Sequence, residues 1–278
     1  MSTASWRDGG SDQATLPVFR VLLLVQVVAA ALFGLIPYFV PGAFAAIAGY
    51  PGREDFVYRL GGAATTGYLV AAILVLRQPG WHAARIPVVA TFTFTAAAAG
   101  GSLVTLIEGD RRWIVWFVFV AATAFALLAA YWLVRDPSER RLTGGPGRRV
   151  FSALPDWFRL VLGLATVSAL VFGLAPLIIP RTFASLVGLA GTETWVYRMV
   201  GAATLGYATA GVLEIRAHDR SAIAVQNLAA ITFNGLGAIA AAIATFSGHG
   251  AILGPLVLLA AGFFTVALAL GASRTPRD

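Results

Sequence analysis

The chain has 278 residues, of which 58% are hydrophobic and only 12% are charged, and its formal net charge is +7. Globular domains carry about 25% charged residues, so this composition excludes an ordinary soluble domain and indicates a membrane protein. The chain contains no cysteine, which excludes disulfides, thiolate catalysis and cysteine-based metal or iron–sulfur sites.

Residues 1–17 are polar and predict a disordered cytoplasmic tail. Eight apolar stretches follow, each long enough to cross about 30 Å of hydrocarbon as a helix. They cover residues 18–40, 56–77, 86–107, 113–134, 157–179, 195–216, 222–246 and 251–272. The pattern predicts an all-α polytopic membrane protein with eight transmembrane helices.

The sequence contains an internal repeat with an offset of 139 residues. Residues 19–77 and 158–216 are identical at 27 of 59 positions without a gap, although only 10 of the next 50 positions match. Each copy holds four spans, so both copies enter the membrane in the same direction and an axis along the membrane normal relates them. We therefore predict two parallel four-helix repeats, at 18–134 and 156–273, joined by a basic cytoplasmic linker at 135–155. Residues 274–278 form a second cytoplasmic tail.

The placement of charge predicts the orientation of the chain. All 20 basic residues are arginines, which we interpret as the codon usage of a GC-rich bacterial genome. With the N-terminus inside, 14 of these 20 arginines fall on inner segments. The positive-inside rule then predicts a bacterial plasma membrane protein with both termini in the cytoplasm. The linker is expected to contact anionic lipid rather than nucleic acid.

A short segment follows the first span of each repeat. Both copies keep two prolines four residues apart, then Phe44 or Phe183, and then glycines. Because proline suits the first turn of a helix and glycine its end, each segment predicts a helix of one or two turns on the outer face. It serves either as an interfacial connector or as a lid over an outward-facing pocket.

The second span of each repeat opens on a Tyr-Arg pair. A cation at a helix N-terminus opposes the macrodipole and costs about 0.3–1 kcal/mol, so something should offset the charge. A glutamate four residues before the tyrosine, a lipid phosphate and an anionic ligand are the three candidates. The alternative is that tyrosine anchors at the interface while arginine extends to the headgroups. The candidate ligand-binding residues at this end are Glu54, Tyr58, Arg59, Glu193, Tyr197 and Arg198.

The same spans carry small residues four apart. Ala63 with Gly67, and Ala202 with Gly206, match the pattern that lets two helix backbones approach closely in a membrane. We expect these four residues to pack helices together, within a repeat or between the two repeats.

Polar residues also fall within the predicted spans. Asn227 and Asn234 are seven residues apart and share a face of the seventh span. They either form interhelical hydrogen bonds or, together with Gln26, line a substrate cavity. Glu214 stands where the first repeat has Val75, and it is either an intramembrane functional carboxylate or a side chain that extends to the interface and pairs with arginine.

One half of the chain resembles the DoxX-like small membrane proteins. The matching residues are Gly34, Pro37, Arg59 and Gly62, repeated as Gly173, Pro176, Arg198 and Gly201, and they cover the first two helices of each repeat. The resemblance implies a four-helix bundle for each half and, for some members of that group, a link to membrane redox complexes. Duplication within one chain departs from the single unit of that group.

Two functions are compatible with this sequence. The first is binding or transport of a small anionic or amphipathic molecule between two pseudo-symmetric bundles. The second is a non-catalytic accessory subunit that holds a partner protein or lipid. A membrane enzyme comes third, since the sequence predicts no catalytic residue, no metal site and no cofactor. The expected partners are membrane lipids, such a ligand, and a second copy or another membrane protein, but no nucleic acid.

Overall fold

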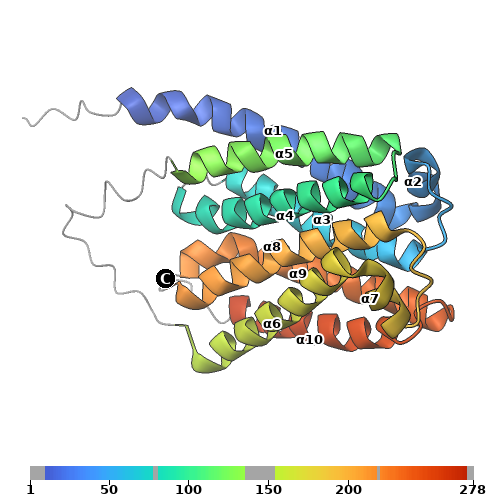
Figure 1. Cartoon of the computed structure of the whole chain (residues 1–278). Coiled ribbons are helices and arrows are strands. Elements are labelled where there is room, and N and C mark those ends of the chain that lie inside the picture. Colours follow the sequence, from blue (N-terminus) through green and yellow to red (C-terminus); the bar gives the residue numbers. More distant parts are fainter. Residues whose placement is uncertain (1–9, 78–80, 135–153, 218–219, 274–278) are drawn as a thin grey trace, which may run out of the picture.

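A computed structural model describes residues 10–77, 81–134, 154–217 and 220–273 (Figure 1). Every regular element in these ranges is a helix. The ten helices are α1 Gly10–Phe39, α2 Pro41–Ala48, α3 Asp55–Arg77, α4 Trp81–Ile107, α5 Trp113–Val134, α6 Asp156–Ile178, α7 Pro180–Leu186, α8 Thr194–Arg216, α9 Arg220–Phe246 and α10 Leu253–Ser273. The start of α1 and the end of α10 lie at one end of the bundle, and α2 and α7 lie at the other (Figure 1), which we call the α2/α7 end.

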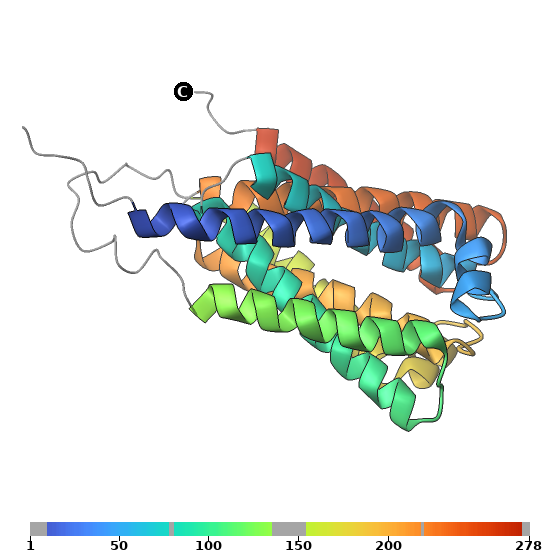
Figure 2. The ribbon, with the colours of Figure 1, turned by 90° about the horizontal axis from the view of Figure 1, so that it is seen from above.

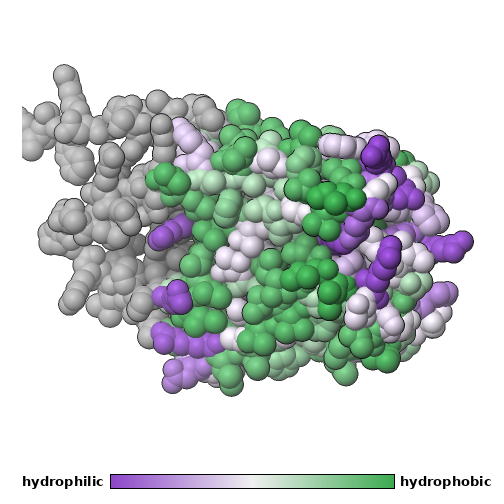
Figure 3. Space-filling view, viewed as in Figure 1, coloured by the Kyte–Doolittle hydropathy of each residue, from purple (hydrophilic) through white to green (hydrophobic). Residues whose placement is uncertain are grey.

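Among the described residues, seven helices are long and apolar enough to cross a membrane. They are α1, α3, α4, α5, α6, α9 and α10. Helix α8 is as long as α3, with 23 residues, but it is not one of these seven helices. Figure 3 shows the corresponding surface, in which an apolar belt crosses the middle of the bundle and hydrophilic residues gather at the α2/α7 end. The chain is therefore a multi-pass integral membrane protein.

The helix ends differ from the sequence prediction at a few places. Helix α1 begins at Gly10, so residues 10–17 of the predicted tail are helical. Hydropathy marks the part of a helix that can lie in lipid rather than the residue at which the helix begins, so it misplaces such a boundary. Helix α4 begins at Trp81 and includes Pro87. The remainder of the first tail, residues 135–153 of the linker and the second tail lie outside the described residues.

The two short helices predicted after the first span of each repeat are confirmed as α2 and α7. Each begins with a proline in its first turn. The chain then reverses at Gly49 and Gly188, whose φ angles are +83° and +78°. These left-handed conformations are favourable only for glycine, so both helices end where the sequence places a residue without Cβ.

The helices interleave rather than forming two separate bundles. Helix α3 packs against α1 and α9, whereas α8 packs against α6 and α4. Consecutive helices α3 and α4, like α8 and α9, contact each other only slightly. Helix α4 packs on α5 and α9 packs on α10. In Figure 2 the long helices run lengthwise through the bundle. Helices α3 and α8 thus form the centre of the molecule, each held by one helix from either half of the chain.

Close backbone contact fixes two of these crossings. A Cβ on Gly62 would lie 2.6 Å from the Gly34 carbonyl oxygen, and a Cβ on Gly201 would lie 2.6 Å from that of Gly173. Such contacts are too short for any side chain, so only glycine permits α1 to cross α3, and α6 to cross α8, at this distance. Packing of small residues stabilises helix pairs in lipid, where apolar burial alone gives little advantage.

Candidate functional site

Two buried glutamates connect the halves of the chain at the α2/α7 end. Glu54 precedes α3, and its Oε2 accepts a 2.8 Å hydrogen bond from the Tyr197 hydroxyl on α8. Its Oε1 accepts a 3.2 Å bond from the backbone N–H of Thr192. Glu193 precedes α8 and accepts a 3.0 Å bond from the backbone N–H of Arg53. Because the two glutamates are only 4% and 1% exposed, these bonds replace water around their carboxylates.

Tyr58 occupies on α3 the place that Tyr197 has on α8. It interacts with Glu193, but its hydroxyl and Oε2 of Glu193 make no hydrogen bond of ordinary geometry with the residues described. We call Glu54, Tyr58, Glu193 and Tyr197 the crossed cluster. All four are buried, and each tyrosine faces the glutamate of the other half of the chain. Contacts within the protein therefore explain why these four side chains lie buried at this position.

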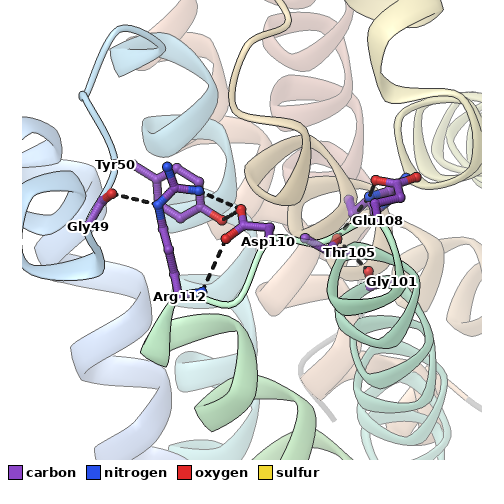
Figure 4. A network of polar contacts seen from close by, with 8 residues as sticks. Gly49, Tyr50, Gly101, Thr105, Glu108, Asp110 and Arg112 are labelled. Atoms are coloured by element: carbon purple, nitrogen blue, oxygen red, sulfur yellow. Dashed lines mark hydrogen bonds and ion pairs between the residues drawn. The ribbon is translucent and has the colours of Figure 1, made fainter.

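The charge of Arg198, in the first turn of α8, is neutralised by Glu108, which directly follows α4. Its guanidinium donates to both carboxylate oxygens of Glu108 at 2.6 and 2.7 Å and to the Thr105 hydroxyl at 2.8 Å (Figure 4). The hydrogen bonds from Arg198 lower the pKa of Glu108, an effect that outweighs its partial burial. Glu108, rather than Glu193, therefore offsets the arginine charge at this helix N-terminus.

Arg59 has a different environment from Arg198. It is half-buried, and its Nη1 donates a 3.2 Å hydrogen bond to the backbone carbonyl of Tyr38. The residue 139 positions after Glu108 is Ser247, so the second half of the chain offers Arg59 no matching carboxylate. Neither arginine is among the residues that line the two cavities described below.

A second polar network ties the loop before α3 to the loop before α5 (Figure 4). Arg112 donates to the Gly49 carbonyl at 2.6 Å and to Asp110 at 2.6 Å, and its guanidinium lies 4.2 Å from the Tyr50 ring centre. The Tyr50 hydroxyl also donates to Asp110, at 2.9 Å. Burial and then the hydrogen bond to Asp110 raise the pKa of Tyr50. The network closes the α2/α7 end between α2 and α5.

Four aromatic rings occupy the centre of the bundle. Tyr68 and Tyr207 lie 4.9 Å apart between ring centres, and each stacks on a phenylalanine, Phe94 and Phe233 respectively. The Tyr68 hydroxyl donates to the Ala203 carbonyl at 2.8 Å, and the Tyr207 hydroxyl donates to the Ala64 carbonyl at 2.9 Å. Each hydrogen bond thus joins α3 to α8.

The small residues predicted to pack helices lie beside these rings. Gly67 faces the Tyr207 hydroxyl and lies so close to α9 that a Cβ would be 2.7 Å from the Ala229 carbonyl oxygen. Gly206 faces the Tyr68 hydroxyl and α4 in the same way. Ala63 and Ala202 are fully buried next to them. All four therefore stand where the two halves of the chain meet.

The two asparagines of α9 that were predicted to act together lie in different environments. Asn227 is 4% exposed and its Nδ2 donates a long, 3.4 Å bond to the Leu268 carbonyl on α10, while its Oδ1 has no partner among the described residues. Asn234 donates at 2.8 Å to the Ala230 carbonyl of its own helix and lines a cavity. Asn234 and Gln26 therefore line two different cavities, and Asn227 contacts a neighbouring helix.

The larger cavity, of about 660 Å³, lies among α1, α3, α4, α5 and α8, and we call it the α1–α5 cavity. Its walls are mostly apolar, and Gln26 donates a 3.1 Å hydrogen bond to the Thr91 hydroxyl within it. The polar or partly polar residues of the lining are Gln26, Tyr58, Thr65, Tyr68, Thr91, Thr95 and Trp195.

This cavity opens sideways between α1 and α5. The α1 side chains that line it include Val28 and Leu32, which are 60% and 50% exposed. Phe117 of α5 also lines it and is 50% exposed. Since these residues belong to the apolar belt, the opening faces the lipid tails. The two helices meet through a contact of Phe19 with Trp132 and a stack of Phe33 on Phe117, with the cavity lining between them.

The smaller cavity, of about 150 Å³, lies mainly among α6, α8, α9 and α10 and is called the α6–α10 cavity. Its lining matches that of the α1–α5 cavity at positions 139 residues apart, including Tyr197, Tyr207 and Phe233. The helices beside the two cavities pack differently. Helix α10 packs on α6, where the Phe158 ring lies against Gly271. The residue that corresponds to Gly271 is Trp132, and α5 meets α1 through the rings of Trp132 and Phe117.

Sequence reasoning missed Glu108, Trp132 and the aromatic stack. The sequence does carry a signal for the stack, because Tyr68 with Phe94 and Tyr207 with Phe233 recur at the offset of 139. For Glu108 there is no such signal, because its counterpart is Ser247 and its partner lies 90 residues away.

No family model matches the sequence, and neither a curated protein nor a solved structure is similar enough to count as a match. The resemblance of each half to the DoxX-like proteins therefore stays a prediction, and functional conclusions depend on the geometry.

Proposed function

We propose that the protein spans the plasma membrane of a bacterium eight times, as two parallel four-helix repeats with both termini in the cytoplasm. The reciprocal contacts support a pseudo-twofold relation, since the bonds from Tyr68 to Ala203 and from Tyr207 to Ala64 exchange under the 139-residue offset. Helix α8 serves as the eighth span, because it has the length of α3 and lies between α6 and α4.

Cysteine labelling tests this orientation without background, because the chain has no cysteine of its own. Arg111→Cys, in the loop between α4 and α5, should react with a membrane-impermeant maleimide added outside. Gly144→Cys, in the linker, should react only when the cytoplasmic face is opened. Labelling of both from the same side would overturn the two-repeat topology.

The function that the geometry supports best is binding of an amphipathic molecule that enters from the membrane. Release of that molecule would make the protein a transporter. The observation that carries this proposal is the α1–α5 cavity, which is open to lipid between α1 and α5. Its volume of about 660 Å³ falls in the range of small-molecule sites, which is roughly 300–1,000 Å³. A long apolar body fits its walls, and the pair of Gln26 and Thr91 offers hydrogen bonds to a polar group.

The charges favour an amphipathic ligand over a small anion. Arg198 has its charge offset by Glu108, and the carboxylates of the crossed cluster are hydrogen-bonded from within the protein. Neither Arg198 nor Arg59 lines the cavity. A ligand bound there is therefore held by apolar burial and by a few hydrogen bonds rather than by ion pairs.

Native mass spectrometry of gently extracted protein tests the proposal. Wild-type protein should retain a discrete small-molecule mass, and Ala121→Trp, which fills the cavity from α5, should lose it. Ala124→Trp is the matched control, because Ala124 lies on the exposed face of the same helix and outside the lining. Equal retention by all three proteins would place the ligand elsewhere. A stoichiometric protein partner with no small molecule would favour the accessory-subunit alternative.

A further inference from the structure

The α6–α10 cavity holds an isolated carboxylate. Glu214 lines this cavity from α8 and is 4% exposed, and its Oε1 has no hydrogen-bond partner among the residues described. No ion pair joins Glu214 to a charged side chain among the described residues. Of the two arginines nearby in the sequence, Arg216 is exposed at the end of α8, and the Arg220 side chain lies outside the described part of the structure. A carboxylate without a compensating charge is costly inside a membrane, so a positive species should neutralise it.

A second polar group faces the same space without a partner. Gln226 lines the cavity from α9, is 1% exposed, and has neither its amide nitrogen nor its amide oxygen hydrogen-bonded to the described residues. Buried amides are almost always hydrogen-bonded, so an unpaired one indicates an occupant that supplies the missing bonds. The corresponding residues of the first half are Val75 for Glu214 and Pro87 for Gln226. The polar pair is therefore no requirement of the shared fold.

The remaining walls select the kind of occupant. Phe172, Tyr207, Phe233 and Phe264 surround the cavity with aromatic rings. Aromatic faces attract cations, and together with one carboxylate they form the usual environment of an organic ammonium group. A divalent metal ion would need several oxygen ligands, and the described residues contain no group of three acidic, histidine or cysteine side chains. A proton on Glu214 would leave the amide and the space of about 150 Å³ unfilled.

We propose that the α6–α10 cavity binds a small lipophilic amine in its ammonium form, with Glu214 as its counter-charge and Gln226 as its hydrogen-bond partner. The apolar part of the amine packs against the aromatic rings. Access is lateral, because Leu256 of α10 both lines the cavity and is 45% exposed. This site is separate from the α1–α5 cavity and does not depend on the function proposed for it.

The other charged residues at this end of the helices around the cavity are Asp156, Arg159, Arg216 and Arg220. Arg159 lies on α6, three residues before the lining residue Leu162, and its Nε is buried without a hydrogen-bond partner among the described residues. Arg159 therefore forms no Nε bond with Glu214, and both Asp156 and Arg216 are exposed.

Isothermal titration of the full chain in lipid nanodiscs tests the site. The probe is 2-phenylethylamine, which carries one ring and one ammonium, and its neutral analogue 2-phenylethanol serves as the ligand control. Glu214→Gln keeps the shape of the side chain but removes its charge. Asp55→Asn is the matched protein control, because it removes an exposed carboxylate from α3 outside the cavity. Thermal unfolding of each variant shows whether it remains folded.

Wild type and Asp55→Asn should bind one amine per chain, and Glu214→Gln should weaken binding by about 30-fold or more. The alcohol should bind equally weakly to all three proteins. Amine binding that is the same in wild type and in folded Glu214→Gln would overturn the proposal. Proton uptake that depends on Glu214 without any amine binding, measured in buffers of different ionisation enthalpy, would also overturn it and identify a proton site. Whether Ala121→Trp retains or loses the small molecule of the α1–α5 cavity leaves this result unaffected, so the two proposals fail independently.

Discussion

The contact of Gly67 with the opposite half of the chain leads to a quantitative prediction. In Gly67→Ala the new methyl group meets the Tyr207 hydroxyl and lies 2.7 Å from the Ala229 carbonyl oxygen. Overpacking of this kind costs about 1–3 kcal/mol, and loss of the 2.9 Å bond from Tyr207 to the Ala64 carbonyl costs about 1 kcal/mol more. Alanine recovers about 1 kcal/mol through its higher helix propensity. We expect a net loss of about 2 kcal/mol, or about 30-fold in the unfolding equilibrium constant.

Unfolding in mixed micelles with increasing sodium dodecyl sulfate, followed by tryptophan fluorescence, measures this loss. Gly163→Ala is the control, because a Cβ on Gly163 in α6 meets no atom within 4 Å. It should leave stability unchanged or raise it by up to about 1 kcal/mol.

A second substitution identifies the source of the loss. Tyr207→Phe removes the hydroxyl that the new methyl group strikes, so in the double variant with Gly67→Ala only the conflict with α9 remains. The combined loss should then fall short of the sum of the single losses by about 1 kcal/mol. If Gly67→Ala unfolds at the same detergent fraction as Gly163→Ala, the close approach of α3 to α8 and α9 is not as described. If the two losses add fully, the contact of Gly67 with the Tyr207 hydroxyl is not as described.

Three further substitutions test other parts of the structure. Glu108→Gln should cost about 1 kcal/mol at neutral pH, because Glu108 is half-exposed. Since its folded pKa lies below the unfolded value, wild-type stability should fall as pH drops below the ordinary glutamate range, and the variant should lack that dependence. Trp132→Gly should draw α5 towards α1 and release the bound molecule detected by native mass spectrometry, while the exposed Trp116→Gly should retain it. Tyr197→Phe should lose about 1.5–3 kcal/mol in the detergent titration and Tyr58→Phe clearly less, so equal losses would contradict the difference in hydrogen bonding.

Much of the fold follows from local features of the sequence. Hydropathy predicts the long helices, and proline followed by glycine predicts α2 and α7, because both signals act within a few residues. The partners of the helices do not follow from such signals. Helix α3 packs on α1 and α9, whereas it contacts α4, the next helix in the chain, only slightly. Apolar surfaces are interchangeable in lipid, so only small residues and specific hydrogen bonds distinguish one partner from another.

The same limit applies to the candidate site. The sequence singled out Glu54 and Glu193 before two spans, where the glutamate of the same half was one of three candidates to offset each arginine charge. Because α3 and α8 cross at the centre, each glutamate instead faces the tyrosine of the other half. Arg198 then finds Glu108 at the end of α4, which packs on α8. These pairs depend on the interleaved packing, which no spacing along the chain reveals.

The two cavities share much of their lining but differ in charge. Residues that join the halves, such as Tyr68 and Tyr207, are identical at the 139-residue offset, since each stabilises the same crossing. Glu214, which lines the α6–α10 cavity, corresponds to Val75 in the first half. The glutamate gives this cavity a charged side chain, and none lines the α1–α5 cavity. A duplicated frame with two unlike cavities supports two ligands of different chemistry, so each substitution in a wall should affect one ligand and leave the other bound.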